Sequence, residues 1–276
     1  MRRIVRLQST RLLPGLAALS LVALLGCNQN PAPAGGVGPP PGAAPADGGA
    51  APAPRATLSP ELSSLFRLIG QGRTDRARPR LLTYLALDPQ DGKAEFLLGL
   101  TYHREKRYSL ARPHFDRAVD LSPEYHPAHH FRGWCLFYLG DMEAARRSFE
   151  EHLRYVPDEG DSHFALGLID LDADRLDDAQ RRFGEAIELQ AANPRRVRDV
   201  AKAHARLADV YVRRDRLEEA KSHLLTATGM YPDHYSAYFK LYRVLTRLGE
   251  NEAAERALAD YRISKARVRP EPGHPE

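Results

Sequence analysis

Only two cysteines occur among the 276 residues of this chain, Cys27 and Cys135. Two cysteines are too few for the disulfide framework of a small secreted domain, so we expect no disulfide bond. Cys135 has no evident pocket of lysine, arginine or histidine that would activate its thiol. Its position in the middle of a predicted helix favours a small buried side chain instead.

Motifs of the common enzyme classes are also missing. The sequence contains no nucleophile elbow, no glycine-rich phosphate loop and no metalloprotease motif. We therefore expect no enzymatic activity, no cofactor and no small-molecule substrate. An unrecognised hydrolase is the remote alternative.

The N-terminal apolar run is too short for a membrane-spanning helix of about 20 residues. It extends from Leu12 to Leu25, contains Pro14 and follows several arginines, as is typical of a targeting segment. The run ends in the sequence LLGC at residues 24–27, which resembles the lipobox of bacterial lipoproteins. The resemblance implies that residues 1–26 are a signal peptide and that Cys27 is lipidated. The alternatives are an ordinary secretory signal with an incidental cysteine and, from Arg2-Arg3, twin-arginine export.

Removal of this segment changes the charge balance. The chain has 40 Lys+Arg and 36 Asp+Glu, and residues 1–26 contain four arginines and no acidic residue. The processed chain is therefore formally neutral, and its charge gives no support to a nucleic-acid partner. Asn28 follows the cysteine, where an aspartate would favour retention in the inner membrane. We expect an outer-membrane anchor facing the periplasm, with the membrane contacted through lipid.

Residues 27–57 are rich in proline, alanine and glycine and contain few large apolar side chains. This composition predicts a disordered stem, which as a coil would span about 30 Å and fully extended about 90 Å. Residues 266–276 are likewise expected to form a disordered tail.

The rest of the chain is periodic. One position of the repeat is Leu65, Gly99, Gly133, Gly167, Ala208 and Tyr242, with seven extra residues before Ala208. Twelve residues further on, every unit has alanine: Ala77, Ala111, Ala145, Ala179, Ala220 and Ala254. Each unit also carries Leu or Phe in its second half: Leu81, Phe115, Phe149, Phe183, Leu224 and Leu258. Fixed-period similarity of this kind, with a period of about 34 residues, indicates a repeat array.

The units resemble tetratricopeptide repeats, each a helix-turn-helix of about 34 residues. The resemblance implies an all-α, right-handed superhelical solenoid of six repeats, at residues 58–91, 92–125, 126–159, 160–200, 201–234 and 235–265. We expect the glycine of the first helix to face the alanine of the second, because both allow close approach. Local irregularity is expected where Arg132, His152 and Ala191 depart from the pattern.

The seven-residue insertion lies near residues 193–200. Asn193 followed by Pro194 is typical of an N-cap and first helical residue, so we expect it to lengthen the first helix of repeat five by about two turns. Arg195, Arg196 and Arg198 would then project as a solvated basic face, or alternatively bind an acidic partner or lipid headgroups.

Two clusters have partial metal-ligand spacing. His126, His129 and His130 could place two imidazoles on one helix face, but no further ligand motif accompanies them, so we expect surface histidines and no metal. Histidines recur at equivalent positions, at His129, His163 and His204. Asp170, Asp172 and Asp174 begin like a calcium loop that then lacks the required Gly and Glu, so we expect a solvated turn.

In tetratricopeptide arrays the first helices line a concave groove. The positions predicted to line it here are Phe96, Leu100, His103, Arg104, His130, Trp134, Phe137, Tyr138, Phe164, Leu168, Leu171, Arg206, Arg213, Phe239, Lys240, Arg243 and Arg247. The expected groove is apolar in its middle and basic towards its C-terminal end, with Trp134 as the anchor for a protein or peptide partner. The alternative is that Trp134 and Phe137 belong to the core. The carboxylate clamp of chaperone-binding repeats is absent, since Phe96, Leu100 and His130 occupy its positions.

Signal, lipobox, stem and repeats together predict a membrane-anchored scaffold that binds protein segments and assists assembly of an envelope complex. The layout is similar to that of pilotin-type lipoproteins of type IV pili. A protein that contacts peptidoglycan or another carbohydrate is the alternative, in which aromatic side chains stack on sugar rings.

Overall fold

The computed structural model describes residues 57–269, and the predictions that concern Cys27, the signal peptide and most of the stem lie outside this range. Within it the chain forms twelve α-helices, one short 3-10 helix and no strand. The first three pairs are α2 (Pro60–Gly70) with α3 (Thr74–Leu87), α4 (Gly92–Arg104) with α5 (Tyr108–Leu121), and α6 (His126–Leu139) with α7 (Met142–Tyr155). Then come α8 (Gly160–Asp172) with α9 (Leu176–Ala191), η1 (Pro194–Arg196), α10 (Val197–Arg213) with α11 (Leu217–Met230), and α12 (Tyr235–Leu248) with α13 (Asn251–Val268). The expected all-α architecture is confirmed.

Local chemistry explains where several of these helices begin. The Ser59 hydroxyl accepts a hydrogen bond from the Leu62 amide ahead of Pro60, the first residue of α2. One carboxylate oxygen of Asp91 accepts from the amides of Lys93 and Ala94 and so caps α4. These side chains satisfy amide groups that have no partner inside a helix.

The turns inside the helix pairs reproduce the repeat of the sequence. Each contains one residue with a left-handed backbone conformation: Gly72, Lys106, Gly140, Asp174, Asp215 and Gly249. Successive members are one period of the sequence repeat apart, except that the step from Asp174 to Asp215 is longer by the insertion. The period and the insertion are thus both confirmed by the backbone.

Close contacts mark the seam between paired helices. A Cβ atom added at Gly133 would lie 2.7 Å from the Phe149 ring, and the corresponding distance from Gly167 to the Phe183 ring is also 2.7 Å. Gly99 faces Phe115 in the same way, at 2.9 Å. The glycine therefore makes room for the aromatic ring of the second helix.

The irregularities expected at three positions are mostly absent. Helix α6 runs without interruption through Arg132, whose guanidinium bonds Asp116 and Ser148. Helix α7 likewise continues through His152. Only Ala191 marks a change, because α9 extends to it over 16 residues whereas α7 has 14.

The insertion is distributed over three elements. Asn193 caps η1 by accepting a hydrogen bond from the Arg195 amide, and Pro194 is the first residue of that 3-10 helix. Helix α10 has 17 residues, against 14 in α12, so it gains less than the predicted two turns. Arg196 does not project into solvent, because it pairs with Glu159, Asp161 and Asp199. The predicted basic face is therefore wrong at Arg196.

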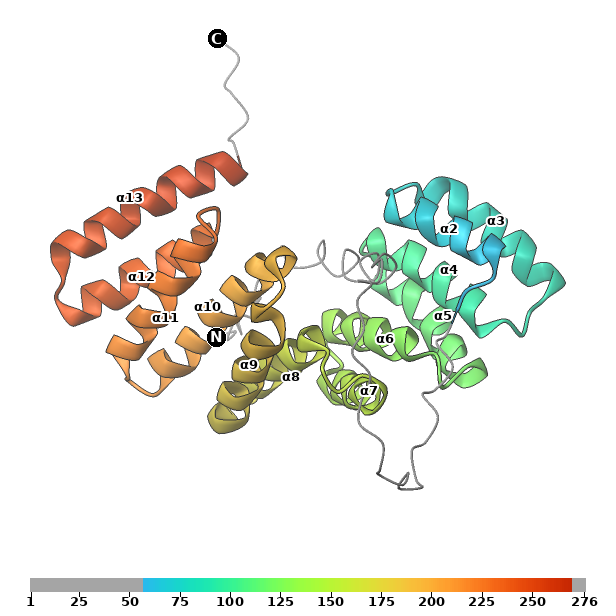
Figure 1. The fold of residues 1–276 in the computed structure, drawn as a ribbon, viewed down its shortest axis with the longest axis horizontal. Helices are drawn as coiled ribbons and strands as arrows, with labels where there is room; N and C mark the ends of the chain where they lie inside the picture. The colour runs from blue at the N-terminus through green and yellow to red at the C-terminus, as the bar shows by residue number, and fades with distance from the viewer. Residues whose placement is uncertain (1–56, 270–276) are drawn as a thin grey trace, which may run out of the picture.

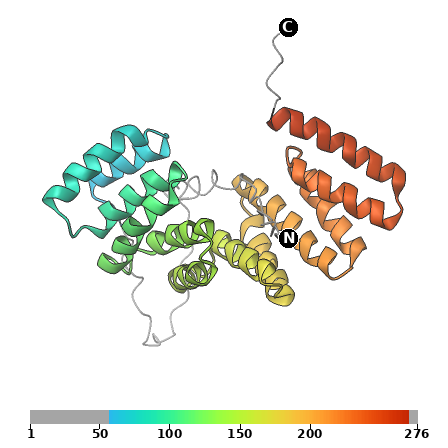
Figure 2. The same ribbon diagram turned by 180° about the vertical axis from the view of Figure 1, so that it is seen from behind.

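The helix pairs stack into a curved array, which has the outline of an open U (Figure 1). The first pair, α2 and α3, forms one tip, and α12 and α13 form the other, with α6 to α8 at the base. The view from behind shows the same arrangement (Figure 2). Because each pair contacts mainly its neighbours, the apolar core extends along the whole array.

Candidate partner-binding surface

Nearly half of the residues predicted to line a groove are buried. Each residue of the following group is at most 8% exposed: Phe96, Leu100, His103, His130, Trp134, Phe164, Leu168 and Leu171. The ring of Phe96, for example, lies 5.6 Å from that of Phe131 and 5.2 Å from that of Tyr125. Contacts within the same repeat and with the next one bury these side chains, so the prediction that they form an open apolar groove is wrong.

One group of aromatic side chains reaches the surface beside this core. We call it the aromatic cluster: His103, Tyr108, Trp134, Phe137 and Tyr138, from the end of α4, the start of α5 and the second half of α6. Tyr108 and Tyr138 stack with ring centroids 4.5 Å apart, and Trp134 stacks on Tyr138 at 5.9 Å. Phe137 meets the edge of Trp134 at 5.6 Å. Phe137, Tyr138 and Tyr108 are half-buried, so the cluster has both an accessible and a buried side.

Two nitrogen atoms in the aromatic cluster are buried without a hydrogen-bond partner. They are Trp134 Nε1 and His103 Nε2. Burial, with a smaller contribution from the charge of Arg104, lowers the pKa of His103 to about 4, so this imidazole is neutral at neutral pH. Unpaired buried polar atoms are rare in proteins and each calls for an explanation.

Basic residues near the C-terminal half of the array are mostly paired. Arg213 contacts Asp174 at 3.1 Å, Arg247 contacts Asp215 at 2.6 Å, and Lys240 contacts Asp209 at 2.6 Å. These contacts join one repeat to the one before it. The predicted basic end of the groove is therefore compensated by aspartates 31 to 39 residues earlier in the chain.

The other predicted groove residues of the C-terminal half, Arg206, Arg243 and Phe239, differ in their surroundings. Arg206 pairs with Asp209 on its own helix at 3.3 Å. Arg243 is exposed, and the structure shows no ion pair for it among residues 57–269. Phe239 is the one predicted groove residue with a large exposed apolar surface, at 41%.

His129 and His163, two of the histidines that recur in the repeat, contact backbone carbonyl oxygens. His129 Nε2 lies 2.8 Å from the Pro123 carbonyl oxygen, and His163 Nε2 lies 2.8 Å from that of Pro157. Both side chains are buried, so the expectation of surface histidines is wrong there. Across residues 57–269 no group of three or more His, Cys, Asp or Glu side chains is placed to hold a metal ion.

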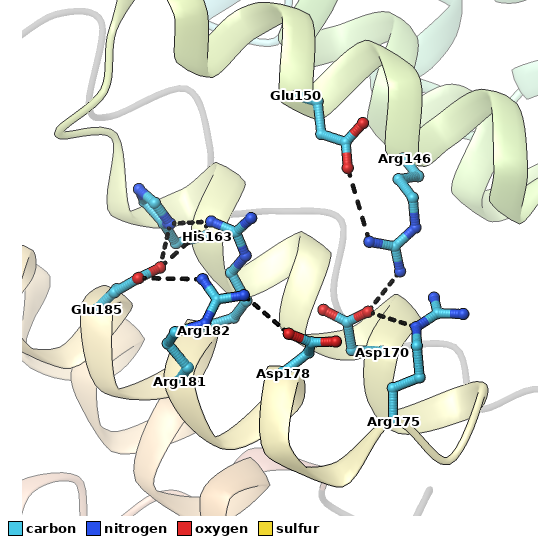
Figure 3. A network of polar contacts seen from close by, with 9 residues as sticks. All are labelled: Arg146, Glu150, His163, Asp170, Arg175, Asp178, Arg181, Arg182 and Glu185. Carbon is cyan, nitrogen blue, oxygen red and sulfur yellow. Dashed lines mark hydrogen bonds and ion pairs between the residues drawn. The ribbon is translucent and has the colours of Figure 1, made fainter.

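The prediction that Asp170 lies in a solvated turn is also wrong. Its side chain is buried in α8, 1% exposed, and one of its oxygens contacts Arg146 at 2.5 Å and Arg175 at 3.0 Å (Figure 3). The same view shows Arg181 bridging Asp178 and Glu185 on the surface of α9. Asp170 thus joins α7, α8 and the start of α9.

Cys135 lies as predicted. Its side chain is buried and its thiol donates to the Tyr108 carbonyl oxygen at 3.1 Å. Burial raises the pKa of the thiol to about 12, so it is not nucleophilic at neutral pH.

A hollow that the sequence did not indicate opens between α11, α12 and α13. It has a volume of about 520 Å³, its apolar lining includes Leu225, Leu241 and Leu245, and the Lys221–Glu250 ion pair is also part of the lining. None of the predicted groove residues lines it. Its lining residues are spaced as ordinary core and surface positions, so the sequence carries no signal for it.

None of the helices in residues 57–269 combines the length and the apolar character needed to cross a membrane.

Solved structures of several different proteins share this fold. The structure of the APC/C hetero-tetramer Cut9-Hcn1 matches 76% of this chain and 40% of its own, with a TM-score of 0.63 and 16% identity. The structure from the functional characterisation of Pseudomonas aeruginosa pilF matches 76% of this chain and 91% of its own, with a TM-score of 0.62 and 17% identity. YrrB, described as a TPR protein with an unusual peptide-binding site, matches 69% and 93%, with a TM-score of 0.52 and 17% identity. At these identities the likeness establishes the fold alone.

Sequence comparison gives the family. Anaphase-promoting complex subunit 3 of Schizosaccharomyces pombe is 30% identical over 98 residues, which cover 36% of this chain and only 15% of that protein. The sequence profile of the tetratricopeptide repeat matches residues 67–126, 132–194 and 205–267. These matches include more than half of the residues, and the chain therefore belongs to the tetratricopeptide repeat family.

Proposed function

We propose that this protein is a membrane-anchored scaffold that binds segments of other proteins through the aromatic cluster. The anchor is a lipid on Cys27, and the array faces the periplasm from the outer membrane. Both statements rest on the sequence of residues 1–28.

The observation that carries the binding proposal is the group of half-buried aromatic rings, Tyr108, Phe137 and Tyr138, which lie beside two buried nitrogens without a hydrogen-bond partner, Trp134 Nε1 and His103 Nε2. A buried donor without a partner costs about 1–3 kcal/mol. A peptide segment offers apolar side chains for Phe137 and Tyr138, and we infer that a movement of these half-buried rings opens the buried indole N–H to one of its carbonyl oxygens. Binding would recover that free energy while covering apolar surface, which is how ligand sites usually combine the two.

The comparisons support a scaffold in general terms. Tetratricopeptide repeat proteins are generally non-enzymatic scaffolds, and one structural relative is described as having a peptide-binding site. The lipobox and the stem predicted from the sequence favour a role in assembling an envelope complex.

A conservative substitution tests the aromatic cluster. Trp134→Phe removes the indole N–H but keeps an aromatic ring, and we expect it to weaken retention of partner proteins about tenfold, the equivalent of one hydrogen bond. The measurement is a pull-down from solubilised envelopes with the purified full-length protein. Tyr155→Phe is the matched control, because this exposed tyrosine lies on α7, outside the aromatic cluster.

The double variant Phe137→Ala, Tyr138→Ala removes accessible rings and should have the same effect. Unchanged protein partners with both variants would exclude the aromatic cluster as the binding site. Retention of the protein by isolated sacculi, lost in the double variant, would instead favour the carbohydrate alternative.

A further inference from the structure

The C-terminal end of the array exposes positions that are covered in the earlier repeats. Phe239 is 41% exposed, whereas the residues at the equivalent position in the five earlier repeats are at most 8% exposed: Leu62, Phe96, His130, Phe164 and Ala205. On the second helix, Tyr261 is half-buried, whereas its equivalents in repeats two to five are at most 4% exposed: Ala118, His152, Ala186 and Ala227. In residues 57–269 no seventh repeat follows to cover them.

Three half-buried aromatic side chains surround exposed Phe239 at this end of the array. We call them the terminal platform: Tyr235, Phe239, Tyr242 and Tyr261, with Arg243 one helical turn after Phe239. The rings of Phe239 and Tyr261 are 5.3 Å apart, those of Phe239 and Tyr242 6.1 Å, and those of Tyr235 and Tyr261 6.3 Å. Helices α12 and α13 form the platform at one tip of the U (Figure 1). Polar side chains would be favoured at these positions if the surface faced only solvent.

The junction between repeats five and six shows how a helix packs on the equivalent surface of the preceding repeat. There α12 is the incoming helix, and its Lys240 ammonium lies 2.6 Å from Asp209 and 3.2 Å from the Ala205 carbonyl oxygen. Asp209 is the equivalent of Arg243, and Ala205 is the equivalent of Phe239, each in the preceding repeat. The charge that meets the incoming helix is thus reversed at the last repeat.

From this register we propose that the terminal platform docks an amphipathic helix of a partner protein, with a carboxylate at the place that Lys240 takes in the preceding junction. The apolar face of that helix covers Phe239 and Tyr261, and its Asp or Glu pairs with Arg243. Exposed Arg262 and Lys265 on α13 add positive charge beside the platform. This surface is separate from the aromatic cluster and does not depend on it.

A second copy of this chain fits the same register poorly. In head-to-tail stacking, α2 would be the incoming helix, and the equivalent of Lys240 in α2 is Ser63, which has no charge for Arg243. The charge pattern therefore favours a different protein over a filament of identical chains.

Two synthetic peptides test the proposal on the purified full-length protein. Both have the sequence of α12, Tyr235–Leu248; one keeps lysine at the position of Lys240 and the other has glutamate there. We expect the glutamate peptide to bind about five- to tenfold more tightly, because one peptide attracts Arg243 and the other repels it. The variant Arg243→Glu should reverse this preference, with an unchanged urea midpoint because the side chain is exposed.

Trp134→Phe serves as the independent control and should leave peptide binding unchanged, which separates this surface from the aromatic cluster. A photo-crosslinker at position 239 in cells should yield an adduct with a different protein, diminished by Arg243→Glu. The proposal is overturned if neither peptide binds, if the glutamate preference survives Arg243→Glu, or if the adduct has twice the mass of this chain.

Discussion

Single residues in this array act mostly through the contacts between neighbouring repeats. Asp170 is the clearest case, since it is buried and contacts two arginines from different elements. Its spacing with Asp172 and Asp174 predicts an exposed turn, but only Asp174 has the left-handed turn conformation. A carboxylate in this position holds α7 against α8. Its removal leaves the charge of Arg146 without its buried partner.

Replacing Asp170 with asparagine should lower the free energy of unfolding by about 3 kcal/mol, because Arg146 would lose its buried partner. Urea unfolding followed by circular dichroism measures the change. Asp178→Asn is the matched control: Asp178 pairs with Arg181 on the surface of α9, where solvent screens the pair, so its loss should leave the urea midpoint nearly unchanged. Equal effects for the two variants would contradict the structural role of Asp170.

Buried histidines make the stability of the array depend on pH. His130 and His152 both place Nδ1 against the Ser162 hydroxyl, at 3.0 and 2.8 Å. Burial lowers the pKa of His130 to about 3 and that of His152 to about 2, with further lowering from neighbouring histidines. In the unfolded chain the pKa of histidine is about 6.5. Between these values the unfolded chain binds more protons than the folded one, so stability is complete above about pH 6.5 and decreases as the pH falls.

We therefore expect a lower urea midpoint at pH 5.5 than at pH 7.5, with a slope of up to about 1.4 kcal/mol per pH unit for each such histidine. His152→Gln should reduce the difference between the two pH values, although His103, His204 and His234 keep part of it because burial lowers their pKa values to about 4. A pH difference identical to that of the wild type would show that His152 does not contribute.

At the scale of helices, close packing between the members of a pair depends on glycine in the first helix. Gly133 lies against the Phe149 ring, and Phe149 is fully buried. Alanine is the better helix former, yet its methyl group has no room here. The repeated glycine is thus a packing requirement between helices and not a feature of a single helix.

Gly133→Ala should lower the free energy of unfolding by about 1–3 kcal/mol, since the added Cβ would meet the ring at 2.7 Å. Gly184→Ala in α9 is the matched control, because no other atom lies within 4 Å of the added Cβ. That variant should stabilise the protein by about 0.5–1 kcal/mol through helix propensity. Thermal or urea unfolding of both variants gives the comparison, and destabilisation by Gly184→Ala would refute this explanation.

At the scale of the whole molecule, the array is a curved stack with two different ends. The N-terminal pair begins at a capped helix, and the C-terminal pair exposes the terminal platform. The proposed lipid anchor joins the N-terminal side through the stem. The platform lies at the other tip of the U from α2 and α3 (Figure 1).

Replacing Cys27 with serine should release the protein from membranes into the soluble periplasmic fraction, because serine cannot accept the thioether-linked lipid. Cell fractionation followed by immunoblotting measures this. Cys135→Ser is the control for cysteine loss as such and should leave the protein with the membranes. Persistent membrane association of the Cys27→Ser variant would refute the lipobox assignment.

The amino-acid sequence by itself determined the number of helix pairs, their approximate boundaries and the site of the insertion, because each rests on residues close together in the chain. Glycine, alanine and a large apolar residue at fixed spacing are enough to specify a helical hairpin, and the burial of Cys135 follows from its place in one. Sequence could also single out Trp134, Phe137 and Tyr138 as unusual.

Only the tertiary structure decided which faces of the helices are covered. Phe96, Leu100 and Trp134 looked like groove residues because of their place in the first helix of each repeat, but packing within and between repeats buries them. Arg213 and Arg247 looked free because their aspartate partners are 39 and 32 residues earlier. Exposure and pairing depend on how consecutive repeats stack. That stacking is set by contacts between segments of different repeats, which lie far apart along the chain, so no local pattern in the sequence reveals it.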